Sequence, residues 1–228
     1  MTRRRPLLVA LALLAAAGFA WLGAWQVERR AWKHELIARV AERVAAAPAP
    51  LPTDWSDPDA IEYRRVRVTG RFRHDRETFV QALTERGAGF WVITPLQTAQ
   101  GWLLVNRGFV PPERRRPVTR QAAQLPGAVT ITGLLRLSEP GGGFLRRNNP
   151  ANDRWYSRDV GAIAAVRDVA PVLPFFLDAD ATPNSGGLPV GGLTVIRFAD
   201  NHLAYALTWF TLAAMSIAAA VLLLRQRR

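Results

Sequence analysis

The sequence predicts an α+β membrane protein in which two transmembrane helices, N- and C-terminal, flank a β-rich, mainly antiparallel extracytoplasmic domain. Two observations support this fold class. Residues 6–25 and 203–224 are charge-free apolar runs, whereas residues 26–202 carry 24 of the 30 Lys and Arg residues and all 18 Asp and Glu residues. Within that middle segment, apolar residues alternate with polar ones. This division argues against an ordinary soluble globule, a disordered chain and a many-span transporter.

Each apolar run is long enough to cross a bilayer, since twenty helical residues extend about 30 Å. The basic residues flanking the runs indicate the orientation. Only Arg197 lies shortly before the second run, whereas three arginines follow it. Basic residues favour the cytoplasmic side. We therefore expect cytoplasmic tails at 1–5 and 225–228 and a periplasmic domain at 26–202, in a bacterial inner membrane.

Two alternative interpretations must be weighed: that the first apolar run is a signal peptide, and that the positive charge binds nucleic acid. A cleaved signal peptide would use Gly18 and Ala20 as small residues near the cleavage site, but the apolar run continues to Trp25 without a polar segment. The net charge of +12 does not require nucleic acid, because six of the arginines lie in the tails. At the membrane surface, anionic headgroups of the lipid bilayer attract such basic residues, which explains this part of the charge. We expect no nucleic-acid partner.

The middle segment changes periodicity along its length. Residues 26–46 keep a helical pattern, so the first span is expected to continue as one long amphipathic helix until Pro48, Pro50 and Pro52. Beyond Tyr63 the pattern alternates, with Val66, Val68 and Phe72 on one face. A hairpin turn is expected at residues 100–101, and Asp159 is expected to cap a short helix ending near residue 169. The predicted strands are 64–73, 78–83, 90–96, 102–106, 129–137, 174–177 and 193–198.

The residues offer little catalytic chemistry. The chain has no cysteine and three histidines, which are too dispersed for a metal motif. No G-x-S-x-G elbow, P-loop or dinucleotide glycine pattern occurs, so we predict that the protein is not an enzyme. His34 and His74 fall among charged residues and are expected to be solvated. Ala16, Ala20 and Ala24 form a small-residue stripe that would permit close helix packing.

His202 differs from the other two histidines because it opens the second span. At 100° per residue it shares a face with Tyr205 and Trp209, while Trp25 and Arg29 share a face of the first helix with Trp21 and Trp32. If the helices pack, these residues could form a pocket in which an imidazole ligates haem iron and an arginine meets a carboxylate. In the alternative interpretation no ligand is bound: the aromatic residues simply lie at the membrane interface, and His202 only caps the helix.

Several stretches resemble the surfeit locus protein 1 family. They extend in family order from about residue 22 to residue 209. They are residues 23–29 (GAWQVER), 63–66 (YRRV), 105–111 (VNRGFVP), 148–150 (NNP), 155–159 (WYSRD) and 201–209 (NHLAYALTW).

The resemblance implies an assembly factor for cytochrome c oxidase that handles haem a, transiently bound, at its insertion into the catalytic subunit. The implied partners are that subunit and the proteins that make or deliver haem a. The resemblance implies that His202 is the haem contact of the family, so that it binds the cofactor and ligates its iron. The alternative is a cofactor-free scaffold for assembly intermediates. In the domain, Arg107 is expected to anchor a turn and Trp155 with Tyr156 to pack the core.

Overall fold

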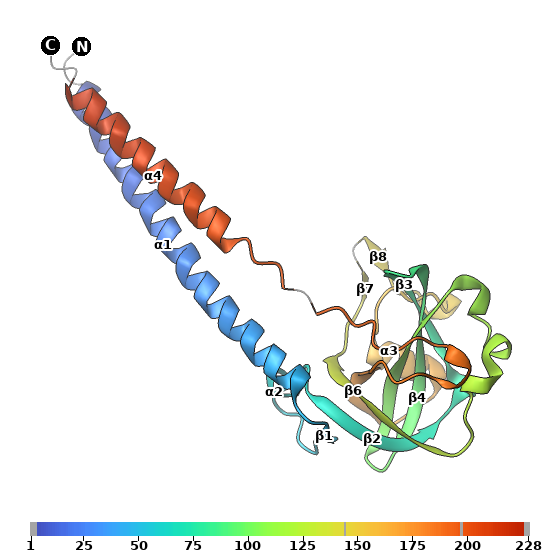
Figure 1. Cartoon of the computed structure of the whole chain (residues 1–228). Helices are drawn as coiled ribbons and strands as arrows, with labels where there is room; N and C mark the ends of the chain where they lie inside the picture. Colours follow the sequence, from blue (N-terminus) through green and yellow to red (C-terminus); the bar gives the residue numbers. More distant parts are fainter. Residues whose placement is uncertain (1–3, 144, 197, 226–228) are drawn as a thin grey trace. The chain divides into compact units, whose positions relative to one another are not determined.

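The computed structural model describes residues 4–143, 145–196 and 198–225. The predicted tails at 1–3 and 226–228 and position 197 of the last predicted strand lie outside these ranges. The chain divides into two compact units, which Figure 1 colours by sequence. We call residues 1–41 with 196–228 the helical unit and residues 42–195 the β-domain. The hydropathy of the sequence divides the chain near residues 25 and 203, whereas packing divides it at 41 and 196. Each unit is described by itself.

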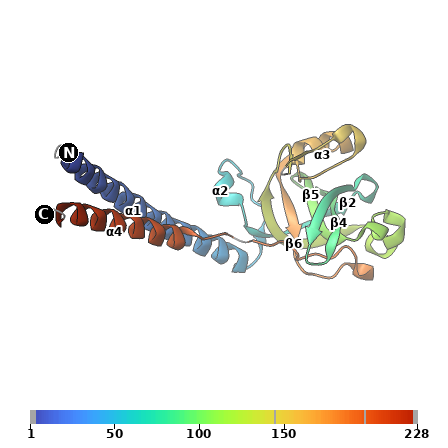
Figure 2. The same ribbon diagram turned by 90° about the horizontal axis from the view of Figure 1, so that it is seen from above.

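The helical unit contains most of α1 (Arg4–Ala45) and all of α4 (His202–Arg225). The helices lie side by side and antiparallel, so that the start of α1 and the end of α4 are neighbours (Figures 1 and 2). Both are long and apolar enough to cross a membrane. The 42 residues of α1 form a single helix, as the uninterrupted helical pattern predicts.

Small residues line the contact between these helices at heptad spacing. Ala16 and Gly23 are buried on α1, and Ala206, Ala213 and Ala220 are buried on α4. Intervals of seven residues keep one stripe facing a partner helix. The predicted stripe of Ala16, Ala20 and Ala24 is therefore wrong beyond its first member, because Ala20 and Ala24 are exposed. We call this contact the seam.

The β-domain is built on a seven-stranded sheet whose order is β1-β2-β6-β9-β5-β4-β3. An additional β2–β4 pairing closes the five strands β2, β6, β9, β5 and β4 into a barrel. The pairs β1–β2 and β5–β9 are parallel and the others antiparallel. The strands are β1 (Ala49–Pro50), β2 (Arg65–Phe72), β3 (Thr78–Thr84), β4 (Gly87–Thr98), β5 (Gly101–Val110), β6 (Ala128–Leu137) and β9 (Val172–Ala179).

Shorter elements complete the domain. A separate two-stranded ladder joins β7 (Gly142–Gly143) to β8 (Arg146–Arg147). The helices are α2 (Pro58–Ile61) and α3 (Val160–Arg167), and Asp159 caps α3 as predicted by accepting from the Ala162 amide at 3.1 Å. Single 3₁₀ segments occur at His74–Arg76, Pro112–Arg114, Pro117–Ala123, Pro150–Asn152 and Ser185–Gly187.

The alternating pattern identifies β2 correctly. Val66, Val68 and Phe72 are buried while the side chains between them reach solvent. The predicted hairpin is also present, because β4 and β5 are joined by a turn at residues 99–100. Strand β5 extends four residues beyond its predicted end, through Arg107, since a buried carboxylate pairs with that charge.

The strand predicted at residues 193–198 is wrong. The described residues of this segment are irregular, and the last strand-like contact before it is the bridge between Val190 and Phe109. A strand needs a neighbour for its backbone hydrogen bonds. The alternation of Leu193 and Val195 could not reveal that the chain has already left the sheet.

The core comprises two clusters. The first contains Leu96, Leu103, Val105, Leu135 and Phe175, which come from four of the barrel strands. The second lies between α3 and strands β3, β4, β5 and β9, and includes Trp155 at 1% exposure. The core role expected of Trp155 is confirmed, and its indole Nε1 donates to Asp153 Oδ1 at 2.7 Å.

Candidate functional site

His202 is the first residue of α4, at the end of the seam away from the chain termini (Figure 1). Its backbone amide donates to Asp200 Oδ1 at 3.2 Å, which satisfies one of the amides that a helix start leaves free. Its side-chain Nδ1 lies 2.8 Å from Oε1 of Gln26 on α1. The histidine therefore joins the two helices of the helical unit.

The contact with Gln26 determines what the imidazole can do. An amide oxygen only accepts hydrogen bonds, so in a neutral imidazole with this contact Nδ1 carries the proton and Nε2 keeps its lone pair. No described residue forms a hydrogen bond with Nε2 in this arrangement. A histidine held at one nitrogen and open at the other is the usual form of an oriented metal ligand.

A charged cluster surrounds the same end of the seam. Asp200 accepts from His34 Nε2 at 2.7 Å and lies 3.7 Å from Nε of Arg30. The hydrogen bond from His34 is the main reason that the pKa of Asp200 lies below its ordinary value. Lys33 donates to the carbonyl of Ala199. His34 is half exposed, as expected, but it is also paired with the carboxylate of Asp200, which the local sequence pattern does not predict.

The predicted aromatic residues lie on different faces of the unit. Trp209 is half-buried and stacks on Phe19 with ring centroids 5.7 Å apart, so it lies in the seam with His202. Trp25 and Tyr205 are 46% and 54% exposed. Arg29 lies over the ring of Trp32 at 3.9 Å. The described contacts bring His202 and Trp209 to the seam but do not bring Trp25, Tyr205 or Arg29 to His202.

Helix geometry explains this difference. Gln26 is three residues after Gly23 and seven after Phe19, so all three face α4. Trp25 is rotated by 100° from Gln26 about the helix axis. The aromatic pattern of α1 does not point to Gln26. The heptad pattern through Gly23 would have identified it.

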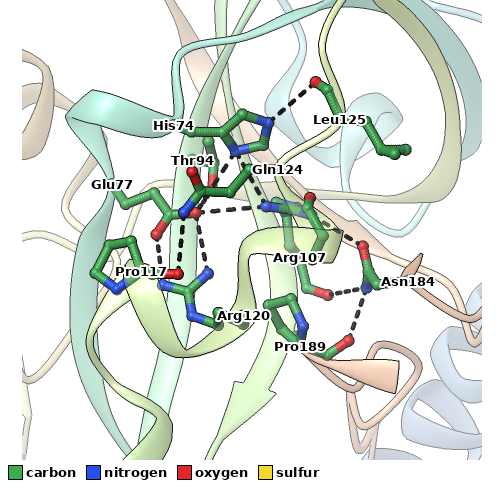
Figure 3. A network of polar contacts seen from close by, with 12 residues as sticks. His74, Glu77, Thr94, Arg107, Pro117, Arg120, Gln124, Leu125, Asn184 and Pro189 are labelled. Atoms are coloured by element: carbon green, nitrogen blue, oxygen red, sulfur yellow. Dashed lines mark hydrogen bonds and ion pairs between the residues drawn. The ribbon is translucent and has the colours of Figure 1, made fainter. Parts of the chain in front are cut away.

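A second polar cluster lies within the β-domain (Figure 3). Glu77 accepts from Arg120 at both oxygens, at 3.2 and 2.5 Å, and from Arg107 at 3.4 Å. His74 lies 3.7 Å from Glu77, and its Nε2 donates to the carbonyl of Leu125 at 3.3 Å. We call these four residues the buried arginine cluster.

Two expectations are corrected by this cluster. His74 was expected to be solvated, but its side chain is only 14% exposed because Glu77 and Arg107 flank it. Arg107 was expected to anchor a turn, but it lies inside β5 with 4% of its side chain exposed. The charged residues near His74 suggested that it is exposed to solvent. In the folded domain, charged residues instead pair with His74 and Arg107 and allow both to be buried.

Comparison with known proteins identifies the family. The model of the SURF1 family matches residues 13–214. The chain belongs to the SURF1 family. It is 38% identical over 221 residues to surfeit locus protein 1 of Mus musculus, covering 90% of this chain and 71% of that protein. The human protein of the same name is 38% identical over 222 residues, covering 90% and 73%. A SURF1-like protein of Monosiga brevicollis is 39% identical over 218 residues, covering 90% and 83%.

The donor set of this SURF1-family chain limits the groups it could hold. Among the described residues, no group of three or more His, Cys, Asp or Glu side chains could enclose a bare metal ion. A haem needs less from the protein, because the porphyrin supplies four ligands and one imidazole can occupy an axial position. His202 offers one ring nitrogen, Nε2, that forms no hydrogen bond with a described residue.

Proposed function

We propose that this protein is an assembly factor for cytochrome c oxidase that holds haem a transiently through Nε2 of His202. Membership of the SURF1 family, with the resemblance described above, supports the role in oxidase assembly. The observation that carries the haem role is the 2.8 Å contact between His202 Nδ1 and Gln26 Oε1. It leaves Nε2 as the only ring nitrogen with a free lone pair.

The surroundings of His202 fit a haem in two respects. The stacked rings of Phe19 and Trp209 give the seam an apolar wall. Arg30 and Lys33 follow Gln26 on α1 and place cationic groups at the same end, where haem carboxylates could pair with them. When bound, haem a supplies the redox-active iron of the oxidase. The protein's task is to orient, shield and release it.

The proposed setting is a membrane with the β-domain on its outer, periplasmic face. Both helices have the length and composition of membrane spans, and they run antiparallel. His202 would then lie at the outer surface of the bilayer, where a haem could be passed to the catalytic subunit or received from the proteins that make it.

A cofactor-free scaffold is the second candidate. The observation that favours it is that His202 already has a structural task, since its contact with Gln26 joins α1 to α4. In that case the imidazole would only hold the seam together while the β-domain binds assembly intermediates. The two candidate functions make different predictions for a variant without the imidazole: the first predicts loss of bound haem, and the second predicts only a weaker contact between α1 and α4.

The test is to purify the full chain in detergent from cells that make haem a and to record its absorption spectrum. We expect a haem a band that His202→Ala reduces at least tenfold, because loss of the ligand itself should cost no less than the roughly 10–100-fold lost with a ligand's hydrogen-bond partner. His34→Ala is the matched control. It removes a histidine from the same end of the helical unit and should retain the band.

Oxidase assembly is measured in the same strains. If the variant His202→Ala loses haem but still co-purifies with oxidase subunits, the haem role and the scaffold role are separable. A wild-type protein without a haem band would leave the scaffold as the function, whereas a band that survives His202→Ala would contradict His202 as the haem ligand. Normal oxidase haem content in a deletion strain would contradict both.

A further inference from the structure

We propose that the β-domain binds a small organic carboxylate with an apolar body, in the pocket where Arg107 of the buried arginine cluster meets the apolar residues of the barrel. The pocket measures about 340 Å³. Buried residues form its base: Phe72, Val105, Arg107 and Ala123. Its rim is exposed and includes Thr130, Leu125, Thr182 and Ser185.

The charge of the buried arginine cluster is unbalanced. Glu77 supplies one negative charge, whereas Arg107 and Arg120 supply two positive charges, and all three side chains are at least 96% buried. Arg120 forms a two-point contact with Glu77. Arg107 makes a single, longer contact of 3.4 Å with the same carboxylate. Arg107 is therefore the cation that lacks a full counter-charge, and burying such a charge is costly.

The hydrogen bonds of Arg107 are also incomplete. Its Nη2 donates to the carbonyl of Ala123 and to Oδ1 of Asn184, while its Nη1 lies near His74 and Glu77. Its Nε is buried and has no hydrogen-bond partner among the described residues. Burial lowers the pKa of Arg107 to about 10. A buried guanidinium with an unused donor is suited to an anion, because each hydrogen bond to a charged group is stronger than a neutral one.

The remaining pocket walls narrow the class of anion. Apolar side chains of Phe72, Val105, Val129 and Ile131 contribute to the lining, which suits a hydrocarbon or aromatic body. The one acidic wall residue, Asp180, lies 3.8 Å from Arg65, which offsets its charge. A single excess positive charge beside apolar walls matches a monoanion better than a phosphate dianion. The site is independent of His202 and of haem.

The probe for the test is 2-naphthoate, with 2-naphthamide as its neutral counterpart of the same shape. Calorimetric titration into the full chain in non-ionic detergent should show that the carboxylate binds at least tenfold more tightly than the amide. Arg107→Lys keeps the charge but loses the guanidinium donors. We expect it to weaken naphthoate binding about tenfold.

Two further variants make the result specific. Arg136 also has a buried Nε without a hydrogen bond among the described residues, although Glu62 lies 3.7 Å from it. Arg136 does not line the pocket, so Arg136→Lys should leave the affinity unchanged. Thr182→Glu adds a negative charge at the exposed rim and should weaken naphthoate binding. It provides a second test of the pocket in case Arg107→Lys does not fold. Equal binding of carboxylate and amide, or binding that Thr182→Glu does not change, would overturn the proposal. His202→Ala should have no effect.

Discussion

Glu77 shows how one side chain can decide whether two others are tolerated inside the β-domain. It is the only carboxylate that contacts both Arg107 and Arg120 among the described ion pairs. Its oxygens also accept from Thr94 at 3.3 Å. A buried ion pair adds little net stability, but removing one partner leaves the other charge uncompensated.

We therefore expect Glu77→Gln to destabilise the β-domain by about 3–5 kcal/mol, because it leaves two buried guanidinium groups without a counter-charge. Denaturant unfolding followed by tryptophan fluorescence measures this loss. Glu85→Gln, in the turn after β3, is the control and should change stability by less than about 0.5 kcal/mol. Equal stability of the two variants would mean that the cluster does not depend on Glu77.

The same carboxylate predicts the direction of the pH dependence. Burial raises the pKa of Glu77, but the contacts with His74 and Arg120 and the charges of Arg120 and Arg107 outweigh it and lower the pKa below its ordinary value. A lowered pKa in the folded state stabilises the protein above the ordinary pKa of glutamate, and this stability is lost as the pH falls through the folded value. Acid unfolding below about pH 4 should be shallower in Glu77→Gln than in the wild type.

At the scale of elements, Gly23 leaves room on α1 for the ring of Phe210 on α4. A side-chain Cβ at this position would lie 2.6 Å from the ring of Phe210, whereas a Cβ at Gly18 would meet nothing within 4 Å. Both glycines lie on α1, so the pair separates a packing effect from the lower helix propensity of glycine. Helices approach closely in membranes where small residues line the contact.

Gly23→Leu is therefore expected to separate the helices, and Gly18→Leu is not. The absence of native cysteines permits a direct assay. With Phe19→Cys and Trp209→Cys introduced at the stacked ring pair, a short bismaleimide should crosslink the two helices. Gly23→Leu should lower the crosslinking yield severalfold. An unchanged yield would show that the seam does not require a small residue at position 23.

The elements also show what sequence patterns can predict. Strand β2 was found because its residues alternate, and its neighbour β6 supplies the hydrogen bonds that a strand needs. The pattern at residues 193–198 has the same alternation but no neighbouring strand, and pairing is not visible in a local pattern. His74 and Arg107 were misplaced for the same reason, because the carboxylate that buries them is known only after the chain folds.

The candidate site was predicted in part. The isolated histidine at the start of the second span was correctly placed beside the first helix, since both spans are straight helices of similar length. Which face of α1 meets it was not predicted, because aromatic residues accumulate at membrane interfaces whether or not they face a partner. The heptad spacing of Ala16 and Gly23 carries that information instead.

At the scale of the whole molecule, charge and hydropathy together predict how the chain crosses the membrane. The two antiparallel helices bring both ends of the helical unit together (Figure 1). Arginines dominate both ends, and basic segments are retained on the cytoplasmic side. The acidic residues lie between the spans, in the part that would be translocated.

This topology can be tested with single cysteines in the cysteine-free chain. Leu83→Cys places a thiol on β3, where the native side chain is 86% exposed, and Arg225→Cys places one at the exposed end of α4. In bacteria whose outer membrane has been made permeable, a membrane-impermeant maleimide should label Leu83→Cys but not Arg225→Cys. Lysis should allow both to react. If Arg225→Cys is labelled before lysis and Leu83→Cys is not, the orientation is inverted, and His202 would lie on the cytoplasmic side of the membrane.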